Sequence, residues 1–169
     1  MWNLKNKTIV ISGATNGIGK AAAIELSKEN PQLLFTYRNQ DLANELLAEI
    51  KALSPDTQVH SVYCDFSKQD SIKKCADEIN DLCGEIDVLI NNAGVVNTSY
   101  HETNEGIENT FAINHLGYFL FTNLLLHKLK GENETRIVNV SSAAHSFVKK
   151  MQWEDINFKN NFGQGLRPY

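Results

Sequence analysis

Short apolar runs alternate with helical patterns along most of the chain, and this alternation limits the fold more than any other feature. Runs that predict strands cover residues 8–12, 32–37, 59–63, 88–90 and 136–140. Patterns that predict helices cover residues 20–29, 41–53, a segment from about 67 to 82, and 107–129. Strands separated by helices pair in parallel through right-handed crossovers. The sequence therefore predicts an α/β fold with a doubly wound parallel sheet.

One helix start is predicted from local chemistry. Ser67, Lys68, Gln69 and Asp70 form the pattern of a capping box, with Ser67 expected as the N-cap. Residues 72, 75, 79 and 82 then place one apolar face at helical spacing. From His145 onward the pattern becomes polar and glycine-rich, so residues 145–169 are expected to be mostly loop.

Length and composition exclude several classes of protein. A chain of 169 residues is expected to form one domain, 1–169, that buries a real core. The net charge of −4 argues against a nucleic-acid partner, and three cysteines without CxxC spacing argue against a disulfide scaffold and favour a reducing compartment.

The most apolar stretch, 111–129, is interrupted by asparagines and histidines, so a buried helix is expected there rather than a membrane span. No secretory signal pattern is present, and the cytoplasm is the expected location. No metal site is expected, because the histidines have no partners at ligand spacing.

A glycine-rich loop joins the first predicted strand to the first predicted helix. Gly13, Gly17 and Gly19 have the spacing GxxxGxG. Glycine lets a backbone approach a ligand closely, and a helix that begins there directs its free amides at a diphosphate. The alternative is a tight turn that binds nothing. A nucleoside-triphosphate P-loop is excluded, because Ala14 replaces its first glycine and Ala21 its hydroxyl residue.

Four motifs in order resemble those of the short-chain dehydrogenase/reductase family. They are the GxxxGxG loop, Asn91-Asn92-Ala93-Gly94, Asn114 in the long helix, and Val138-Asn139-Val140-Ser141-Ser142. The strings 114–119 and 136–145 further resemble the retinol dehydrogenase-like subgroup. The resemblance implies a Rossmann-type sheet, here ending after about the fifth strand, and a nicotinamide cofactor. It assigns cofactor-binding roles to Gly13, Thr15, Asn16, Gly17, Ile18, Gly19, Asp65, Phe66, Asn91, Ala93 and Gly94.

The end of the second predicted strand indicates which nicotinamide cofactor is bound. NAD-binding sites place a carboxylate there for the ribose 2′-hydroxyl, whereas this strand is followed by Arg38. A guanidinium can hold a 2′-phosphate through paired hydrogen bonds. NADP(H) is therefore expected in preference to NAD(H), and a solvated surface arginine is the alternative. Asp65 is expected to meet the adenine amino group by resemblance, or else to cap the turn at Ser67.

The resemblance also assigns the reacting residues. It makes Ser142 the carbonyl-binding serine, Asn114 the residue that holds a proton-relay water, and Tyr169 the general acid. Each of the first two residues has a structural alternative. The Ser142 hydroxyl could bond to backbone at the end of a strand, and Asn114 could bond within its own helical turn. Tyr169 is the last residue, so the family's paired lysine is not in this sequence. We therefore expect the N-terminal portion of a longer reductase, with weak or no turnover by these residues alone.

Two functions remain open at this point. The first is an NADP(H)-dependent oxidoreductase that interconverts an alcohol and a carbonyl, with a hydrophobic or retinoid-like small molecule as substrate. The second is a non-catalytic NADP(H)-binding module. A hydrolase lacks support, because no GxSxG motif is present. The helix over 107–129 is compatible with a homodimer in a full-length protein.

Overall fold

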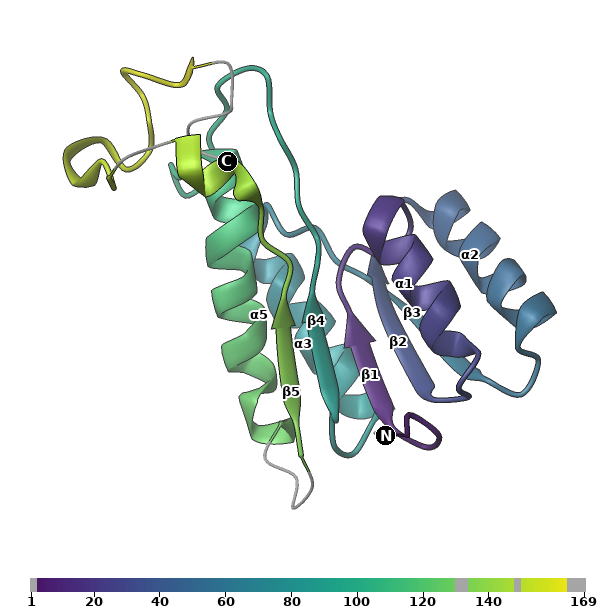
Figure 1. Cartoon of the computed structure of the whole chain (residues 1–169). Helices are drawn as coiled ribbons and strands as arrows, with labels where there is room; N and C mark the ends of the chain where they lie inside the picture. Colours follow the sequence, from purple (N-terminus) through teal and green to yellow (C-terminus); the bar gives the residue numbers. More distant parts are fainter. Residues whose placement is uncertain (1–2, 130–133, 148–149, 164–169) are drawn as a thin grey trace.

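A parallel sheet with helices on both faces forms the computed structural model, which describes residues 3–129, 134–147 and 150–163 (Figure 1). The 5-stranded sheet has the order β3-β2-β1-β4-β5. Its strands are β1 (Thr8–Ile11), β2 (Gln32–Tyr37), β3 (Gln58–Tyr63), β4 (Val88–Asn91) and β5 (Arg136–Asn139). The main helices are α1 (Gly17–Ser27), α2 (Gln40–Leu53), α3 (Gln69–Leu82) and α5 (Gly117–Leu125). The predicted Rossmann-type fold is confirmed.

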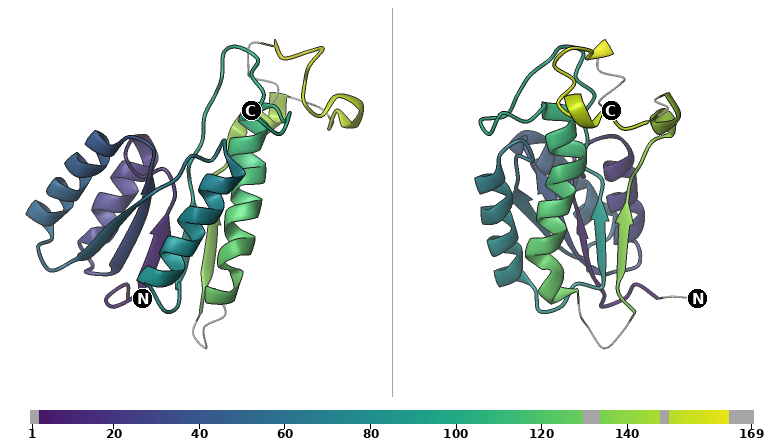
Figure 2. Two further views of the ribbon diagram at one scale, coloured as in Figure 1. Left: turned by 180° about the vertical axis from the view of Figure 1, so that it is seen from behind. Right: turned by 90° about the vertical axis from the view of Figure 1, so that its left-hand side faces the viewer.

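The central strands β1, β2 and β4 bury side chains on both faces, which explains why they read as continuous apolar runs. Ile9, Ile11 and Phe35 pack with α1 and α2 in one buried cluster. Val10 and Leu34, one residue along, pack with α3 and α5 in a second buried cluster. Figure 2 shows α3 and α5 together on the face opposite α1 and α2. Successive residues of a strand point to opposite faces, so two separate cores form around one sheet.

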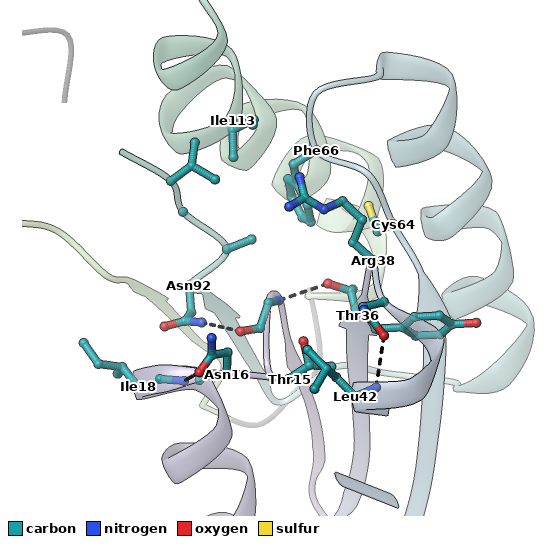
Figure 3. Close-up of a pocket in the computed structure, with 18 of the residues that line it drawn as sticks. Thr15, Asn16, Ile18, Thr36, Arg38, Leu42, Cys64, Phe66, Asn92 and Ile113 are labelled. Carbon is teal, nitrogen blue, oxygen red and sulfur yellow. Dashed lines mark hydrogen bonds between the residues drawn. The ribbon is translucent and has the colours of Figure 1, made fainter. Parts of the chain in front are cut away.

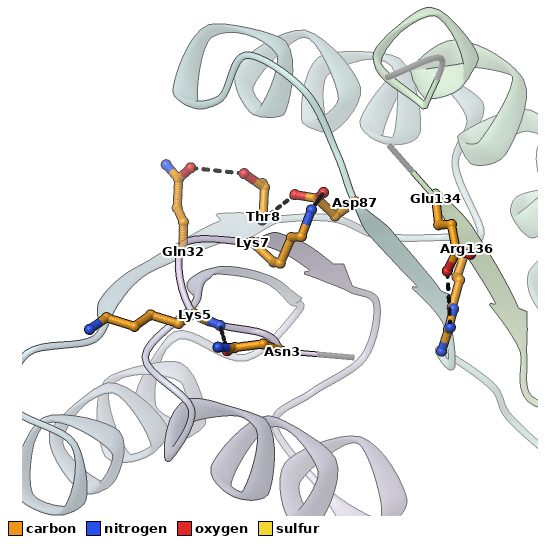
Figure 4. Close-up of polar contacts among 8 residues, drawn as sticks. All are labelled: Asn3, Lys5, Lys7, Thr8, Gln32, Asp87, Glu134 and Arg136. Atoms are coloured by element: carbon orange, nitrogen blue, oxygen red, sulfur yellow. Dashed lines mark hydrogen bonds and ion pairs between the residues drawn. The ribbon is translucent and has the colours of Figure 1, made fainter. Parts of the chain in front are cut away.

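The chain crosses the sheet between β3 and β4, and this crossover determines where a ligand can enter. β1 pairs with β2 on one side and with β4 on the other, both in parallel. The segments that follow β1 and β4 leave the sheet at the same edge and in different directions, and a crevice opens there. At the opposite end, Asp87 accepts hydrogen bonds from the Lys7 ammonium (2.7 Å) and the Thr8 amide (2.8 Å), which fixes the start of β1 beside β4 (Figure 4).

The predicted capping box at Ser67 is wrong. α3 begins at Gln69, and its N-cap, Lys68, makes no side-chain capping bond. The Ser67 hydroxyl instead donates to the Asp65 carboxylate at 2.6 Å. The Ser67 hydroxyl therefore bonds to Asp65, two residues before it, and does not cap the helix as the pattern predicted.

The long helix predicted over 107–129 is present but is not uniform. It starts with the short α4 (Asn109–Phe111), continues through a π-helical turn (Ala112–Leu116) into α5, and ends in a 3₁₀ turn (Leu126–Lys128). Glu108 precedes it, and its buried carboxylate accepts from the amides of Thr110 (2.8 Å) and Phe111 (2.7 Å). Sequence periodicity does not reveal a π turn. The turn adds one residue, which rotates the apolar positions that follow it around the helix axis by less than one full turn.

β5 lies at an edge of the sheet, and all four of its residues are exposed. Two short 3₁₀ turns (Ala143–Phe147 and Trp153–Asp155) interrupt the segment that follows it, which otherwise is irregular over its described residues. Cys64, Cys75 and Cys83 are buried free thiols. None of the helices within the described ranges is long and apolar enough to cross a membrane.

Candidate nucleotide-binding site

A cavity of about 560 Å³ opens at the carboxyl edge of the sheet, where β1, β2, β3 and β4 end. Figure 3 shows its side chains converging from the glycine loop, the end of β2, the end of β3 and the loop after β4. The predicted residues that line it are Gly13, Thr15, Asn16, Gly17, Ile18, Gly19, Arg38, Asp65, Phe66, Ala93 and Gly94. Segments far apart in the sequence therefore enclose one space.

The glycine loop lies directly against the loop after β4. A Cβ at Gly13 would lie 2.6 Å from the Ala93 Cα, and Gly13 has a φ of +65°. A Cβ at Gly19 would overlap the Asn92 amide nitrogen and the Gly13 carbonyl. Two loops pack backbone to backbone here, and only glycine leaves room for this approach. The two loops that line the cavity are therefore in direct contact.

Ser12 and Asn92 hold these two loops together by hydrogen bonds. The Ser12 hydroxyl oxygen accepts from the amides of Asn92 (2.9 Å) and Ala93 (3.0 Å). The Asn92 side-chain amide donates to the carbonyls of Ser12 (3.0 Å) and Gly13 (2.9 Å). The Gly13 amide also donates to the Thr36 hydroxyl at 3.1 Å, which connects the loop to β2.

The N-terminus of α1 faces the cavity and offers backbone amides. Asn16 is its N-cap, and the Asn16 side-chain oxygen accepts from the Gly17 amide at 2.7 Å. No acidic residue stands in the first turn of α1. The positive end of the helix dipole is therefore not neutralised by a carboxylate of its own helix, which favours an anion at this place.

Arg38 lines the cavity from the end of β2 and is exposed. Figure 3 shows its side chain extending over the cavity toward Phe66. Asn39, the next residue, is occupied as the N-cap of α2 and accepts from the Leu42 amide at 3.1 Å. No carboxylate lines the cavity at this strand end, and among the described residues Arg38 pairs with none.

Asp65 lines the cavity from the end of β3 and is nearly buried. Its carboxylate accepts from the Ser67 amide (3.0 Å) and the Ser67 hydroxyl (2.6 Å), and Lys68 lies 3.3 Å away. Burial alone would raise the pKa of Asp65, but the Ser67 hydrogen bonds and the Lys68 ammonium outweigh it and lower this pKa below its ordinary value. The turn cap at Ser67, one of the two predicted roles, is present.

Asn91 does not line the cavity, contrary to the sequence prediction, and Asn92 does. Asn91 is still within β4, and its fully buried amide donates to Asn139 (2.8 Å) and Thr122 (3.0 Å) under α5. Strand alternation explains the difference, because consecutive residues face opposite sides. The alternation of 88–91 is the signal that could have assigned Asn91 to the α5 side.

Asn114 lies in the π-helical turn and contacts the loop after β4. Its side-chain oxygen accepts from the Val95 amide (2.9 Å), and its side-chain nitrogen donates to the Val95 carbonyl (2.8 Å). A Cβ at Gly94 would lie 3.5 Å from the Asn114 oxygen. Asn114 therefore does not bond within its own helical turn, the structural alternative, but fixes a segment that lines the cavity.

Ser142 and the tyrosines make up the rest of the predicted reacting centre. Ser142 lies beyond β5, and its hydroxyl oxygen accepts from the Ala144 amide at 3.1 Å. Val140, two residues earlier, lines the cavity, whereas Ser142 does not. The predicted catalytic Tyr169 lies outside the described residues.

Two other tyrosines near the motifs do not have the features of a general acid. Tyr118 belongs to α5 and packs, partly buried, against the core. Partial burial and a hydrogen bond to Glu102 raise the pKa of Tyr100 to about 12. A raised pKa makes the Tyr100 hydroxyl a weaker proton donor.

The fold, the glycine loop and the loop after β4 together define a nucleotide-binding α/β protein. The sequence profile of the family described as short chain dehydrogenase matches residues 7–153. The chain belongs to this family, whose members use nicotinamide cofactors.

Named relatives agree with this assignment. The chain is 35% identical to human retinol dehydrogenase 13 over 156 residues, which is 92% of this chain and 47% of that protein. It is 39% identical to human retinol dehydrogenase 11 over 163 residues, covering 96% and 51%. The chain thus spans about half the length of the curated relatives it matches.

Solved structures show the same fold. An uncharacterized protein from Mycobacterium paratuberculosis superposes with a TM-score of 0.83 at 30% identity, over 99% of this chain and 57% of that one. A metagenomic short-chain oxidoreductase in complex with NADP superposes with a TM-score of 0.73 at 26% identity, over 83% and 64%.

Proposed function

We propose that this chain binds NADP(H) in the cavity at the carboxyl edge of its sheet. The observation that carries the proposal is the close packing of Gly13 against Ala93, because it brings the glycine loop and the loop after β4 together around the cavity beside the N-terminus of α1. A dinucleotide fits this cradle, since a Cβ at Gly17, where α1 begins, would meet no protein atom within 4 Å and so leaves open space for a diphosphate beside the helix amides. One relative solved by crystallography is in complex with NADP.

We assign the parts of the cofactor to groups at the cavity. The diphosphate lies against the amides at the start of α1, next to Thr15, Asn16 and Ile18. The adenosine 2′-phosphate lies at Arg38, which offers a guanidinium without a competing carboxylate. Asp65 and Phe66 flank the adenine, while Ala93 and Gly94 line the path toward the nicotinamide.

We propose that the complete protein interconverts an alcohol and a carbonyl. The cofactor supplies or accepts the hydride when bound. In this proposal Ser142 donates a hydrogen bond to the substrate oxygen, Asn114 holds the segment at Val95 and a relay water, and Tyr169 protonates the alkoxide. The relatives named retinol dehydrogenase support a hydrophobic aldehyde, ketone or retinoid as the substrate class. We expect weak or no turnover from these 169 residues alone.

A fluorescence titration of the purified chain with NADPH and with NADH tests the cofactor proposal. We expect tighter binding of NADPH, and Arg38→Ala should reduce that preference by roughly 10- to 100-fold, the value of a hydrogen bond to a charged group. Arg136→Ala is the matched control, because Arg136 lies at the opposite end of the sheet beside Glu134. Preference of the wild-type chain for NADH would contradict the role of Arg38.

A second candidate function is a nucleotide-binding module without turnover. It is favoured by the raised pKa of Tyr100, which makes its hydroxyl a weak proton donor, and by the packing of Tyr118 against the core. Hydride transfer separates the two functions. Both outcomes are measured on a chain extended to the length of the curated relatives. Oxidation of NADPH by any of a panel of hydrophobic aldehydes supports the oxidoreductase. NADPH binding without oxidation supports the module.

We also propose that the exposed face of α5 forms a homodimer contact in the complete protein. Phe119 (66% exposed) lies on α5, and Leu126 (43% exposed) begins the 3₁₀ turn that follows it. Sedimentation analysis of wild type and Phe119→Lys tests the contact, and an unchanged dimer in the variant would exclude it.

A further inference from the structure

The segment after β5 folds back onto the loop that precedes the long helix. Residues 101–109 form a small hairpin, in which the Asn109 amide donates to the His101 carbonyl at 3.0 Å and the Thr103 amide to the Ile107 carbonyl at 2.8 Å. Residues 153–163, here called the strap, lie against this hairpin. Figures 1 and 2 show both at the carboxyl end of the sheet, near the start of the long helix.

Asn157 makes the central contact between the strap and the hairpin. Its side-chain oxygen accepts from the Glu108 amide at 3.0 Å, and its side-chain nitrogen donates to the Gly106 carbonyl at 3.0 Å. One side chain thus satisfies a backbone donor and a backbone acceptor, as a neighbouring strand would. This pairing fixes both the position and the orientation of the amide group.

Two further contacts hold the strap in the same place. The Lys159 ammonium lies 2.7 Å from the Glu102 carboxylate, and the Tyr100 and Phe162 rings meet edge to face at 5.7 Å. The exposed ion pair contributes little by itself. Phe158 has a φ of +51°, a conformation unfavourable for a bulky residue, so the contacts around it must compensate for this strain.

Glu108 connects the strap to the candidate site. Its backbone amide is held by Asn157, while its buried carboxylate caps the helix by accepting from Thr110 and Phe111. That helix carries Asn114 six residues later, and Asn114 grips both backbone groups of Val95 on the cavity wall. A continuous set of hydrogen bonds and one helical segment therefore runs from the strap to the cavity.

We propose that Asn157 is a positioning residue for the candidate site. By holding Glu108, it sets where the long helix begins and therefore where Asn114 meets Val95. Its relevance to oxidoreductase chemistry rests on the proposed function. The physical claim concerns only the position of the helix start.

Hydrogen exchange of single backbone amides in the full 169-residue chain tests this proposal. In Asn157→Leu, which keeps the volume and removes both bonds, we expect about tenfold faster exchange at the amides of Glu108 and Val95, as for loss of an ordinary hydrogen bond. Asn160→Leu is the matched control, because this exposed asparagine bonds to other described residues only through its backbone amide. Asn157→Asp keeps the acceptor for the Glu108 amide and should restore slow exchange at both positions in part.

Three results would overturn the proposal. Unchanged exchange at Val95 would confine Asn157 to the strap. Equal acceleration in Asn160→Leu, or in β1 amides such as Val10, would indicate general destabilisation. No recovery in Asn157→Asp would show that the Glu108 contact is irrelevant. Asn157→Ser, too short to reach either group, replaces the leucine variant if that variant does not fold.

The exchange measurement does not depend on cofactor binding. A wild-type chain that fails to bind NADPH would contradict the proposed function while leaving the exchange comparison valid. A chain that binds NADPH but shows no change at Val95 would contradict only the role of Asn157.

Discussion

Gly13 and Gly17 both have a positive φ, but only Gly13 faces the backbone of another loop. A Cβ at Gly13 would overlap Ala93, whereas a Cβ at Gly17 would meet nothing within 4 Å. The two positions therefore separate the cost of backbone strain from the cost of lost space. A sequence pattern treats both glycines alike, because it records spacing and not what each glycine faces.

We expect Gly17→Ala to lower the free energy of unfolding by about 1–2 kcal/mol, from left-handed strain alone. Gly13→Ala should cost more, about 3 kcal/mol, and should abolish NADPH binding because the loop moves away from Ala93. Urea unfolding and NADPH titration measure both effects. Gly84→Ala, at a position with open space, serves as the control. Equal losses at positions 13 and 17 would contradict the role of the Ala93 contact.

Asp65 gives a pH dependence whose sign follows from its lowered pKa. The ordinary pKa is 3.8, and the folded-state pKa lies below it. A group of this kind stabilises the fold above 3.8 and loses that contribution as pH falls through the folded value. Wild type should therefore lose more unfolding free energy than Asp65→Asn in this acidic window. Urea unfolding at several pH values checks this, and parallel pH profiles for the two proteins would contradict it.

The elements themselves were largely predictable from periodicity. The apolar runs and the helical spacing located the strands and main helices to within about three residues, because burial on two faces imposes both patterns. The capping of α3 and the π-helical turn at Asn114 were not predictable. Both depend on which of several nearby acceptors binds a given hydrogen-bond donor, and tertiary contacts determine that choice.

The two loops that carry the site act as one element because Ser12 joins them. The Ser12 side chain is fully buried and accepts from two amides of the loop after β4. Ser12→Ala leaves these amides without a partner and should cost about 2 kcal/mol of unfolding free energy. NADPH binding should weaken as well, since the cradle loses its shape.

Thermal unfolding and NADPH titration measure the Ser12 variant against Ser99→Ala, an exposed serine. Ser99→Ala should leave both quantities nearly unchanged. Normal NADPH affinity in Ser12→Ala would show that the cradle does not need the bond between its loops.

At the scale of the whole molecule, one edge of the sheet is prone to association. Ile137 and Val138 on β5 are each 44% exposed, and β5 has no neighbour on its outer side among the described residues. Unpaired strand edges with apolar residues promote aggregation, and a lysine there opposes it. Val138 is paired in register with Ile90 and therefore faces the side of α1.

We expect Val138→Lys to raise the concentration at which the chain begins to associate. Light scattering across a concentration series measures this effect. Leu53→Lys, which replaces an exposed leucine on α2, is the control and should change little. Association that is equal in wild type and Val138→Lys would locate the sticky surface elsewhere.

The topology followed from the order of elements, whereas the assembly of the site did so only in part. Parallel strands with right-handed crossovers permit few arrangements, so the crevice beside β1 and β4 was foreseeable. The Asn157 contact was not, because it joins residues separated by 49 positions and leaves no periodic trace.

The N-cap of α1 has a consequence for how the cradle behaves between ligands. Asn16 already supplies an oxygen to the Gly17 amide, so this part of the loop is held in shape before any phosphate arrives. An incoming anion replaces the neutral Asn16 oxygen at the Gly17 amide with a charged one. It does not have to order a flexible loop. Affinity is then set by the difference between two acceptors, and arrival of the nucleotide needs little rearrangement beyond the swing of one side chain.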